Sequence, residues 1–333
     1  MGDRLRVGVV GAGMIAGCHV RAYAADDDVD VVAVADPRTD KAQRLAGTVG
    51  ADACADLDGV LDLDVDIVSV CTPPHSHADL TVRALAAGRH VLCEKPLAGS
   101  LADGRRIVEA ARASDRVVMV GQVSRFEPEH RAAKDLVDGG YVGDVAMMLH
   151  SMTAPLPGWS EGGWLTDPRQ SGGPLLDLSV HSFDYLAWLC GSPATRVHAL
   201  AADSPVGPST YTLTTVRYAS GAMGQVEASW AHPAVRGFRA VVEVSGTAGR
   251  ISWDYDSIAG GAMFLDGGET VPFDPLGERG YRREVAAMTH AVREGTPSPV
   301  PAEAGYDAMR TALAAHESLR TGEPVDLTTW KAS

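Results

Sequence analysis

The chain carries little positive charge and has no long hydrophobic run. Its 333 residues hold 29 lysines and arginines against 43 acidic residues, which gives a net charge of −14. Nucleic acids and anionic membranes are bound by basic faces, so this balance argues against both as partners. No apolar run approaches the about 20 residues that span a bilayer. A strand-like run begins at Leu5, and no signal peptide is expected before it, so we expect a cytoplasmic protein.

Cysteine is also scarce, and its spacing is not that of a metal site. The five cysteines are odd in number and scattered along the chain: Cys18, Cys54, Cys71, Cys93 and Cys190. They are expected to be reduced thiols. His75 and His77 lie close together, but no matched carboxylate or cysteine cluster accompanies them. The sequence therefore predicts no metal site.

A glycine turn near the start organises the chain. Leu5–Val10 is a short, β-branched apolar run, and Gly11, Gly13 and Ala16 follow it in the G-x-G-x-x-G/A pattern. Gly11 permits a tight turn, and Gly13 lets a pyrophosphate approach the backbone. The helix predicted for residues 14–25 begins with Met14 and Ile15 and presents unpaired N–H groups to the phosphates. The pattern predicts a dinucleotide site.

An acidic residue supports this prediction and indicates which dinucleotide binds. The apolar run 31–35 ends in Asp36, 25 residues after Gly11, where a carboxylate can accept hydrogen bonds from the adenosine ribose. A 2′-phosphate there would face a like charge. Arg38 could instead pair with such a phosphate or stack on the adenine. We expect NAD rather than NADP.

Strands and helices alternate as far as Ser124, and then the pattern changes. Further strands are predicted at 67–71, 90–93 and 117–120, with helices at 39–49, 76–87 and 101–114. This alternation is typical of a doubly wound parallel sheet, an α/β Rossmann domain. Beyond it lie predicted helices at 128–139, 175–189, 281–294 and 303–319, and predicted strands at 145–153, 211–218, 222–230, 239–245 and 250–253. We expect a Rossmann domain over 1–124 and an α+β domain with a large, mainly antiparallel open sheet over 125–333.

Three loops follow strands of the predicted parallel sheet and carry polar side chains. They are 72–77, 94–96 and 122–125. Ligands bind at the carboxyl ends of such strands. The residues expected to contact the cofactor are therefore Gly11, Gly13, Met14, Ile15, Asp36, Arg38, Thr72, Pro73, His77, Glu94, Lys95 and Gln122.

Asp177 and His181 lie four residues apart on a predicted helix, which would place both on one face. Beside a nicotinamide, His181 could take the proton of a substrate hydroxyl, and Lys95 could stabilise the developing alkoxide. Asp177 could bind substrate or orient the imidazole. Other interpretations stay open at this point, because such pairs also occur on ordinary helix surfaces and Lys95 could be a solvated loop lysine.

Several segments together resemble one family. They are Gly11-Ala-Gly13, Thr72-Pro-Pro-His-Ser-His77, Glu94-Lys-Pro-Leu97, Arg125-Phe126, the segment from Gly172 to Asp184, and Ser245-Gly-Thr-Ala-Gly249. They resemble the Gfo/Idh/MocA family of glucose–fructose oxidoreductase and inositol dehydrogenase. The resemblance implies that Lys95, Asp177 and His181 are catalytic, and that subunits join as homodimers or homotetramers through the open sheet.

The sequence departs from the family pattern at two prolines. Pro74 replaces a frequent asparagine, and Pro174 replaces a third glycine before the catalytic helix. Four residues are candidates for substrate contact: Arg125, Trp159, Trp164 and Tyr281. For the two tryptophans two interpretations stay open: a substrate lid whose indoles stack on the substrate, or an ordered surface loop with buried indoles. Tyr281 could be an ordinary residue near a helix start.

The resemblance implies an NAD-dependent oxidoreductase that moves a hydride between nicotinamide and a secondary alcohol or ketone of a sugar, sugar derivative or cyclitol. One alternative is a glycosidase that oxidises its substrate transiently with NAD. Another is a catalytically silent regulator that senses a sugar or nucleotide, although such a sensor does not need Lys95, Asp177 and His181 together.

Overall fold

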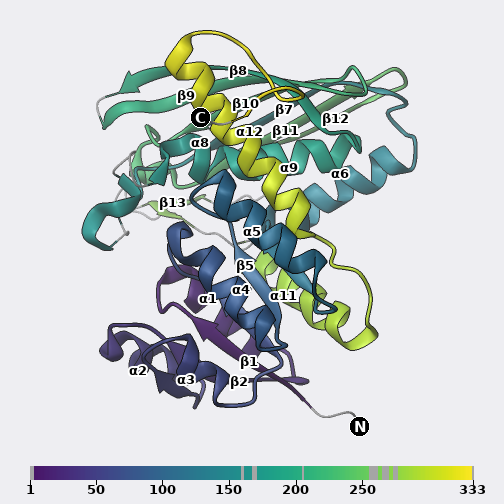
Figure 1. Cartoon of the computed structure of the whole chain (residues 1–333). Coiled ribbons are helices and arrows are strands. Elements are labelled where there is room, and N and C mark those ends of the chain that lie inside the picture. Colours follow the sequence, from purple (N-terminus) through teal and green to yellow (C-terminus); the bar gives the residue numbers. More distant parts are fainter. Residues whose placement is uncertain are drawn as a thin grey trace. The chain divides into compact units, whose positions relative to one another are not determined.

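The computed structural model describes residues 4–158, 161–166, 171–204, 206–254, 262–264, 270–272 and 277–331. The chain forms two compact units (Figure 1). The first comprises Met1–Glu127 and Gly277–Tyr306, and the second Pro128–Leu276 and Asp307–Ser333. By compactness, the segment Gly277–Tyr306 thus groups with the first unit. The functional domains 1–124 and 125–333 stay a prediction.

The first unit contains a six-stranded parallel sheet in the order β3-β2-β1-β4-β5-β6. Its strands are β1 (Leu5–Val10), β2 (Val29–Ala35), β3 (Asp52–Cys54), β4 (Ile67–Val70), β5 (His90–Glu94) and β6 (Val118–Gly121). Its main helices are α1 (Met14–Ala24), α2 (Thr39–Gly47), α3 (Leu57–Leu61), α4 (His77–Ala86), α5 (Leu101–Arg112) and α11 (Gly277–Glu294). This confirms the predicted Rossmann sheet.

The strand order reverses between β1 and β4, which defines the place where a doubly wound sheet binds ligands. The strands in the centre are apolar because helices cover both faces of such a sheet. Val7, Val9, Ile67, Val68 and Val91 are all fully buried.

The second unit contains a seven-stranded sheet in the order β12-β11-β7-β10-β9-β8-β15. Its strands are β7 (Val145–Thr153), β8 (Ala194–Ser204), β9 (Gly207–Tyr218), β10 (Met223–Ser229), β11 (Arg239–Gly246), β12 (Arg250–Asp254) and β15 (Val325–Asp326). Only β7 and β10 among these pairs run parallel. The described part of the unit also holds α6 (Pro128–Asp138), α8 (Gly173–Asp177), α9 (Ser179–Cys190) and a short β13–β14 hairpin (Ala262–Phe264, Thr270–Pro272), while α12 (Ala302–Thr321) begins in the first unit. The prediction of a large, mainly antiparallel sheet is confirmed.

One face of this sheet is covered and the other is more open. Along β9, Thr212, Thr214 and Val216 are buried, whereas Tyr211 and the residues that alternate with them are exposed or half-buried. α9 packs on β7 and β10, and α8 packs on β9. On the open face Met147 of β7 lies opposite Met223 of β10, and their exposed fractions are 44% and 40%.

The single helix predicted over 175–189 is wrong in one respect. The chain forms two helices, α8 and α9, with Leu178 between them. The N–H of His181 donates to the carbonyl of Leu178, three residues back, which marks a tightened turn at the junction. Asp177 ends α8 and His181 lies in α9, so their spacing of four does not by itself place them on one face.

Candidate active site

The predicted glycine turn lies at the carboxyl end of β1. Gly11 has a φ of +104°, and a Cβ added to it would lie 2.4 Å from the carbonyl oxygen of Cys71. Glycine is therefore required where β1 and β4 end side by side. A Cβ on Gly13 would instead meet nothing within 4 Å. That open space, at the residue that precedes α1, leaves room for a ligand beside the free N–H groups of the helix.

Asp36 closes the same turn from β2. Its carboxylate accepts hydrogen bonds from the N–H of Ala12 at 3.0 Å and the N–H of Arg38 at 2.9 Å. Each carboxylate oxygen has a second lone pair, so both can still accept from a ribose hydroxyl. The guanidinium of Arg38 lies 3.9 Å from Asp36, and the side chain of Arg38 is 57% exposed against 14% for Asp36. Asp36 is thus the more firmly held of the two.

His77 joins two of the predicted cofactor loops. Its Nδ1 lies 3.0 Å from the carbonyl oxygen of Pro96 and its Nε2 lies 2.7 Å from that of Thr72. Burial lowers the pKa of His77, so a neutral ring donates to one of these carbonyls. The hydroxyl of Ser76 donates to Thr72 Oγ1 and contacts the carbonyl of Pro73. The interior position of His77 makes it a support of these loops.

Gln122 and Arg125 follow β6. Gln122 is fully buried, and neither the oxygen nor the nitrogen of its side-chain amide has a hydrogen-bond partner among the described residues. Leaving both groups unsatisfied is costly, which indicates an additional polar partner at this strand end. Arg125 is 9% exposed, and its guanidinium donates to the carbonyl of Pro299 at 3.4 Å, so part of its role is to hold that loop.

Glu94 precedes Lys95 and is buried. One carboxylate oxygen lies 2.9 Å from His19 Nε2, and the other accepts the N–H of Lys95 at 3.0 Å. Glu284 of α11 is buried in the same place, 3.9 Å from His19 Nε2. The ring of Tyr281, a predicted substrate residue, lies 5.7 Å from that of His19.

Sequence reasoning missed His19 and Glu284. A signal for His19 was available, since it falls on the side of α1 formed by the apolar residues Ala16, Val20 and Tyr23. No such signal exists for Glu284, because a glutamate in an amphipathic helix is usually exposed.

In the second unit, a glycine pair precedes Asp177 and His181. Gly172 has a φ of +74°, and a Cβ there would lie 2.6 Å from that of Leu176. His316 of α12 lies 2.6 Å from the carbonyl oxygen of Gly172, and burial lowers the pKa of His316, so its neutral ring can donate this hydrogen bond. His181 is 7% exposed and Asp177 is half-buried. His316 thus fixes the start of the segment that carries both.

The predicted catalytic residues belong to different units. Lys95 belongs to the first unit, and Asp177 and His181 to the second, so their convergence stays a prediction. Trp159 lies outside the described residues, and Trp164 lies in the short helix Glu161–Thr166 without a described side chain.

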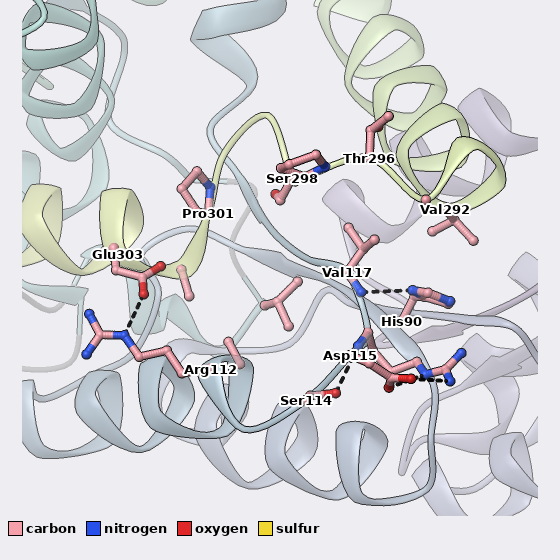
Figure 2. Close-up of a pocket in the computed structure, with 16 residues that line it drawn as sticks. His90, Arg112, Ser114, Asp115, Val117, Val292, Thr296, Ser298, Pro301 and Glu303 are labelled. Atoms are coloured by element: carbon pink, nitrogen blue, oxygen red, sulfur yellow. Dashed lines mark hydrogen bonds and ion pairs between the residues drawn. The ribbon is translucent and has the colours of Figure 1, made fainter.

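A surface pocket lies elsewhere on the first unit. Figure 2 shows it between the end of α5 and the loop that follows α11, with His90 and Val117 on its wall. His90 begins β5, and the N–H of Val117 donates to His90 Nδ1 at 2.9 Å just before β6. The pocket is therefore at the amino ends of these strands, opposite the edge where this class of sheet binds nucleotides.

The first-unit residues fit a dinucleotide. The open space over Gly13 suits a pyrophosphate, and Asp36 offers two acceptor oxygens for ribose hydroxyls. The amide of Gln122, which has no hydrogen-bond partner among the described residues, offers a further polar contact.

Comparison with known proteins agrees with this geometry. A model of the oxidoreductase family with an NAD-binding Rossmann fold matches residues 5–122, and one of the GFO/IDH/MocA C-terminal domain matches residues 130–252. The 1,5-anhydro-D-fructose reductase of Ensifer adhaerens is 31% identical over 80% of this chain and 81% of its own. The chain belongs to the Gfo/Idh/MocA oxidoreductase family.

Two further relatives extend over nearly the whole chain. The myo-inositol 2-dehydrogenase of Thermotoga maritima is 29% identical and covers 97% of this chain and 98% of its own. The crystal structure of GenD2 from gentamicin A biosynthesis, in complex with NAD, is 27% identical with a TM-score of 0.89, over 98% of this chain and 97% of that one. This Gfo/Idh/MocA protein is thus an NAD-binding oxidoreductase. In the described part of the chain, no helix has the length and apolar character needed to cross a membrane.

Proposed function

We propose that this protein is an NAD-dependent dehydrogenase for a secondary alcohol of a cyclitol or sugar, with an inositol-like polyol as the substrate class. The observation that carries the proposal is the turn that combines open space over Gly13 with the fixed carboxylate of Asp36. The relatives named as a myo-inositol 2-dehydrogenase and a 1,5-anhydro-D-fructose reductase support a polyol or sugar substrate.

The cofactor residues divide into direct contacts and supports. Gly13, Met14 and Ile15 present the start of α1, where Met14 is 51% exposed. Asp36 and Arg38 receive the adenosine ribose, and Thr72, Pro73 and Gln122 lie at the ends of β4 and β6 on the same edge of the sheet. Gly11, His77 and Glu94 act by holding these loops, since each is packed against or bonded to protein groups.

Three residues carry the proton chemistry. Bound NAD supplies the hydride acceptor for the substrate carbon. In polyol oxidation His181 takes the proton of the reacting hydroxyl, because an imidazole can change its protonation state near neutral pH. The Lys95 ammonium donates to the same oxygen and stabilises its developing negative charge. Asp177 binds a neighbouring hydroxyl or orients His181, and Arg125, Trp159, Trp164 and Tyr281 are the proposed substrate neighbours.

A panel of cyclitols, sugars and their ketones tests the proposal through the change in nicotinamide absorbance. We expect NAD reduction with at least one cyclitol or sugar alcohol and NADH oxidation with its ketone. Turnover of a glycoside without net NADH, with NAD retained through purification, would instead identify a glycosidase. Absence of turnover across the panel would contradict the substrate class.

A further inference from the structure

A buried site outside the proposed chemistry connects three elements of the first unit. His19 of α1 and Glu284 of α11 are fully buried, and Glu94 of β5 is 6% exposed. His19 Nε2 lies 2.9 Å from Glu94 Oε1, and His19 Nδ1 lies 2.8 Å from Ser69 Oγ. One ligand atom from each of His19, Glu94 and Glu284 lies within 4.8 Å of the others. Two carboxyl groups and one imidazole therefore lie close together in the interior of the first unit.

The two carboxyl groups have different surroundings. Glu94 receives donors on both oxygens, from His19 and from the N–H of Lys95. Neither oxygen of Glu284 has a hydrogen-bond partner among the described residues. Donors stabilise an ionised carboxylate, and burial without donors favours the neutral acid. Two charged carboxylates at this separation in a buried site would repel strongly, so the arrangement favours a charged Glu94 and a neutral Glu284.

The pKa shifts of Glu284 and His19 agree with a neutral Glu284 and a charged Glu94. Burial raises the pKa of Glu284 well above its usual value, and the nearby Glu94 raises it further while His19 lowers it. Burial alone lowers the pKa of His19, but Cys71 and Glu94 outweigh it and the net shift is well upward. Among the described residues, the titratable groups that interact electrostatically with His19, Glu94 or Glu284 include Tyr23, Cys71, His77, Cys93, Glu127 and Tyr281.

The distances favour a proton over a metal ion between these residues. Nitrogen and oxygen ligands on one zinc ion stand about 3.4 Å apart, as its bond lengths and tetrahedral angles require. His19 and Glu94 are at 2.9 Å, an ordinary hydrogen-bond distance. Nδ1 of the same ring is engaged by Ser69, which fixes the ring plane.

The site acts on the loop that carries Lys95. Glu94 Oε2 accepts the N–H of Lys95, and the carbonyl of the following residue, Pro96, lies 3.0 Å from His77 Nδ1. The backbone on both sides of the Lys95 side chain is thus tied to buried histidines. Loss of the His19 charge would replace a charge-assisted hydrogen bond to Glu94 with a weaker neutral one and so loosen the first of these two ties.

We propose that His19 is a positioning residue: its imidazolium holds Glu94 ionised, Glu94 in turn fixes the backbone of Lys95, and Glu284 stays a neutral acid beside them. The assignment of a catalytic consequence rests on the proposed function, since it needs Lys95 at the reacting oxygen.

Glu94→Gln and Glu284→Gln form a matched pair, because glutamine resembles the neutral acid in shape. Glu94→Gln removes the charge that pairs with His19, and should lower Tm by roughly 6 °C or more. Glu284→Gln should be well tolerated. Because the pKa of Glu284 is raised in the folded state, the wild-type protein loses stability as the pH rises above about 4.5, the pKa of this carboxyl group in the unfolded chain. Since glutamine does not ionise, the Tm of Glu284→Gln relative to wild type should rise by at least about 2 °C between about pH 5 and pH 8.

The charge of His19 can be read directly in the full-length protein. Imidazole ¹⁵N spectra of wild type, with the His19 signals assigned by their loss in His19→Gln, should show both nitrogens protonated across about pH 6–8. In turnover, His19→Gln should lower kcat by about 10-fold or more while the Kd for NAD changes by less than about 3-fold. Glu284→Gln should retain wild-type kcat.

Three outcomes that need no substrate would overturn the proposed charge arrangement: a neutral His19 at neutral pH, a Glu284→Gln variant as destabilised as Glu94→Gln, or a stoichiometric divalent metal that Glu284→Gln loses. The spectra and melting curves need no substrate, so they decide the charge state even if the polyol panel fails. If the panel succeeds and His19→Gln keeps wild-type kcat, the positioning role fails while the proposed function stands.

Discussion

The cofactor loops of the first unit and the segment 171–181 of the second differ in how they are fixed. Gly11 lies against the backbone of Cys71, His77 bridges Thr72 and Pro96, and the loops are therefore held at several points. The second segment is anchored at its start by His316 and changes helix at Leu178. The first region is thus held at several points around the predicted cofactor turn, while in the second a local helix junction separates Asp177 from His181, the two side chains that are predicted to be catalytic.

The largest expected effect concerns the second region. His181→Ala should lower kcat by a factor on the order of 10²–10⁴, the usual worth of a general base. The Kd for NAD should change little, because the dinucleotide residues belong to the other unit. Steady-state kinetics and a binding titration measure the two quantities. Near wild-type turnover would show that His181 is not the base. Lys95→Ala should also remove most activity.

Two glycines of the first region should respond differently to the same added methyl group. Gly11→Ala forces a Cβ against Cys71 at a positive φ and should cost about 2 kcal/mol of stability or more. Gly13→Ala enters open space, so it should melt near wild type but bind NAD at least about 10-fold more weakly. Melting curves and NAD titrations of both variants test this contrast. Unchanged NAD affinity in Gly13→Ala would show that the pyrophosphate does not bind at this turn.

Cofactor choice tests Asp36 against Arg38. We expect kcat/KM to favour NAD over NADP by roughly 10-fold, about 1.4 kcal/mol. The bonded, less exposed carboxylate should outweigh the more exposed arginine. Asp36→Ser should erode the preference when both cofactors are measured under identical conditions. If the preference for NAD survives this change, Arg38 and not Asp36 determines which cofactor binds.

The smallest effect concerns the open face of the second sheet. Exposed Met147 and Met223 lie opposite each other there, and exposed apolar side chains on a sheet favour cover by another subunit. Light scattering should show a homodimer or homotetramer, and Met223→Glu should weaken it. Leu136→Glu, at an exposed site on α6, is the matched control. A wild-type monomer at all working concentrations would refute this prediction.

The sequence predicted the elements whose causes are local. The run Leu5–Val10, the two glycines and Asp36 fall where expected, since each depends on a few neighbouring residues. β3 escaped notice because Asp52–Cys54 is short and partly polar. The junction at Leu178 was missed because α-helical spacing continues through it. The cluster around His19 could not be predicted, since Glu94 and Glu284 meet only through tertiary packing.

Direct hydride transfer tests the central claim. Wild-type enzyme should be incubated with NAD and a polyol deuterated at its carbinol carbons, and the reduced cofactor and the product isolated. The account predicts NADH that carries one deuterium for each ketone formed, and the same reaction slowed on the order of 10²–10⁴-fold in His181→Ala. Conversion of the polyol without deuterated NADH would contradict it.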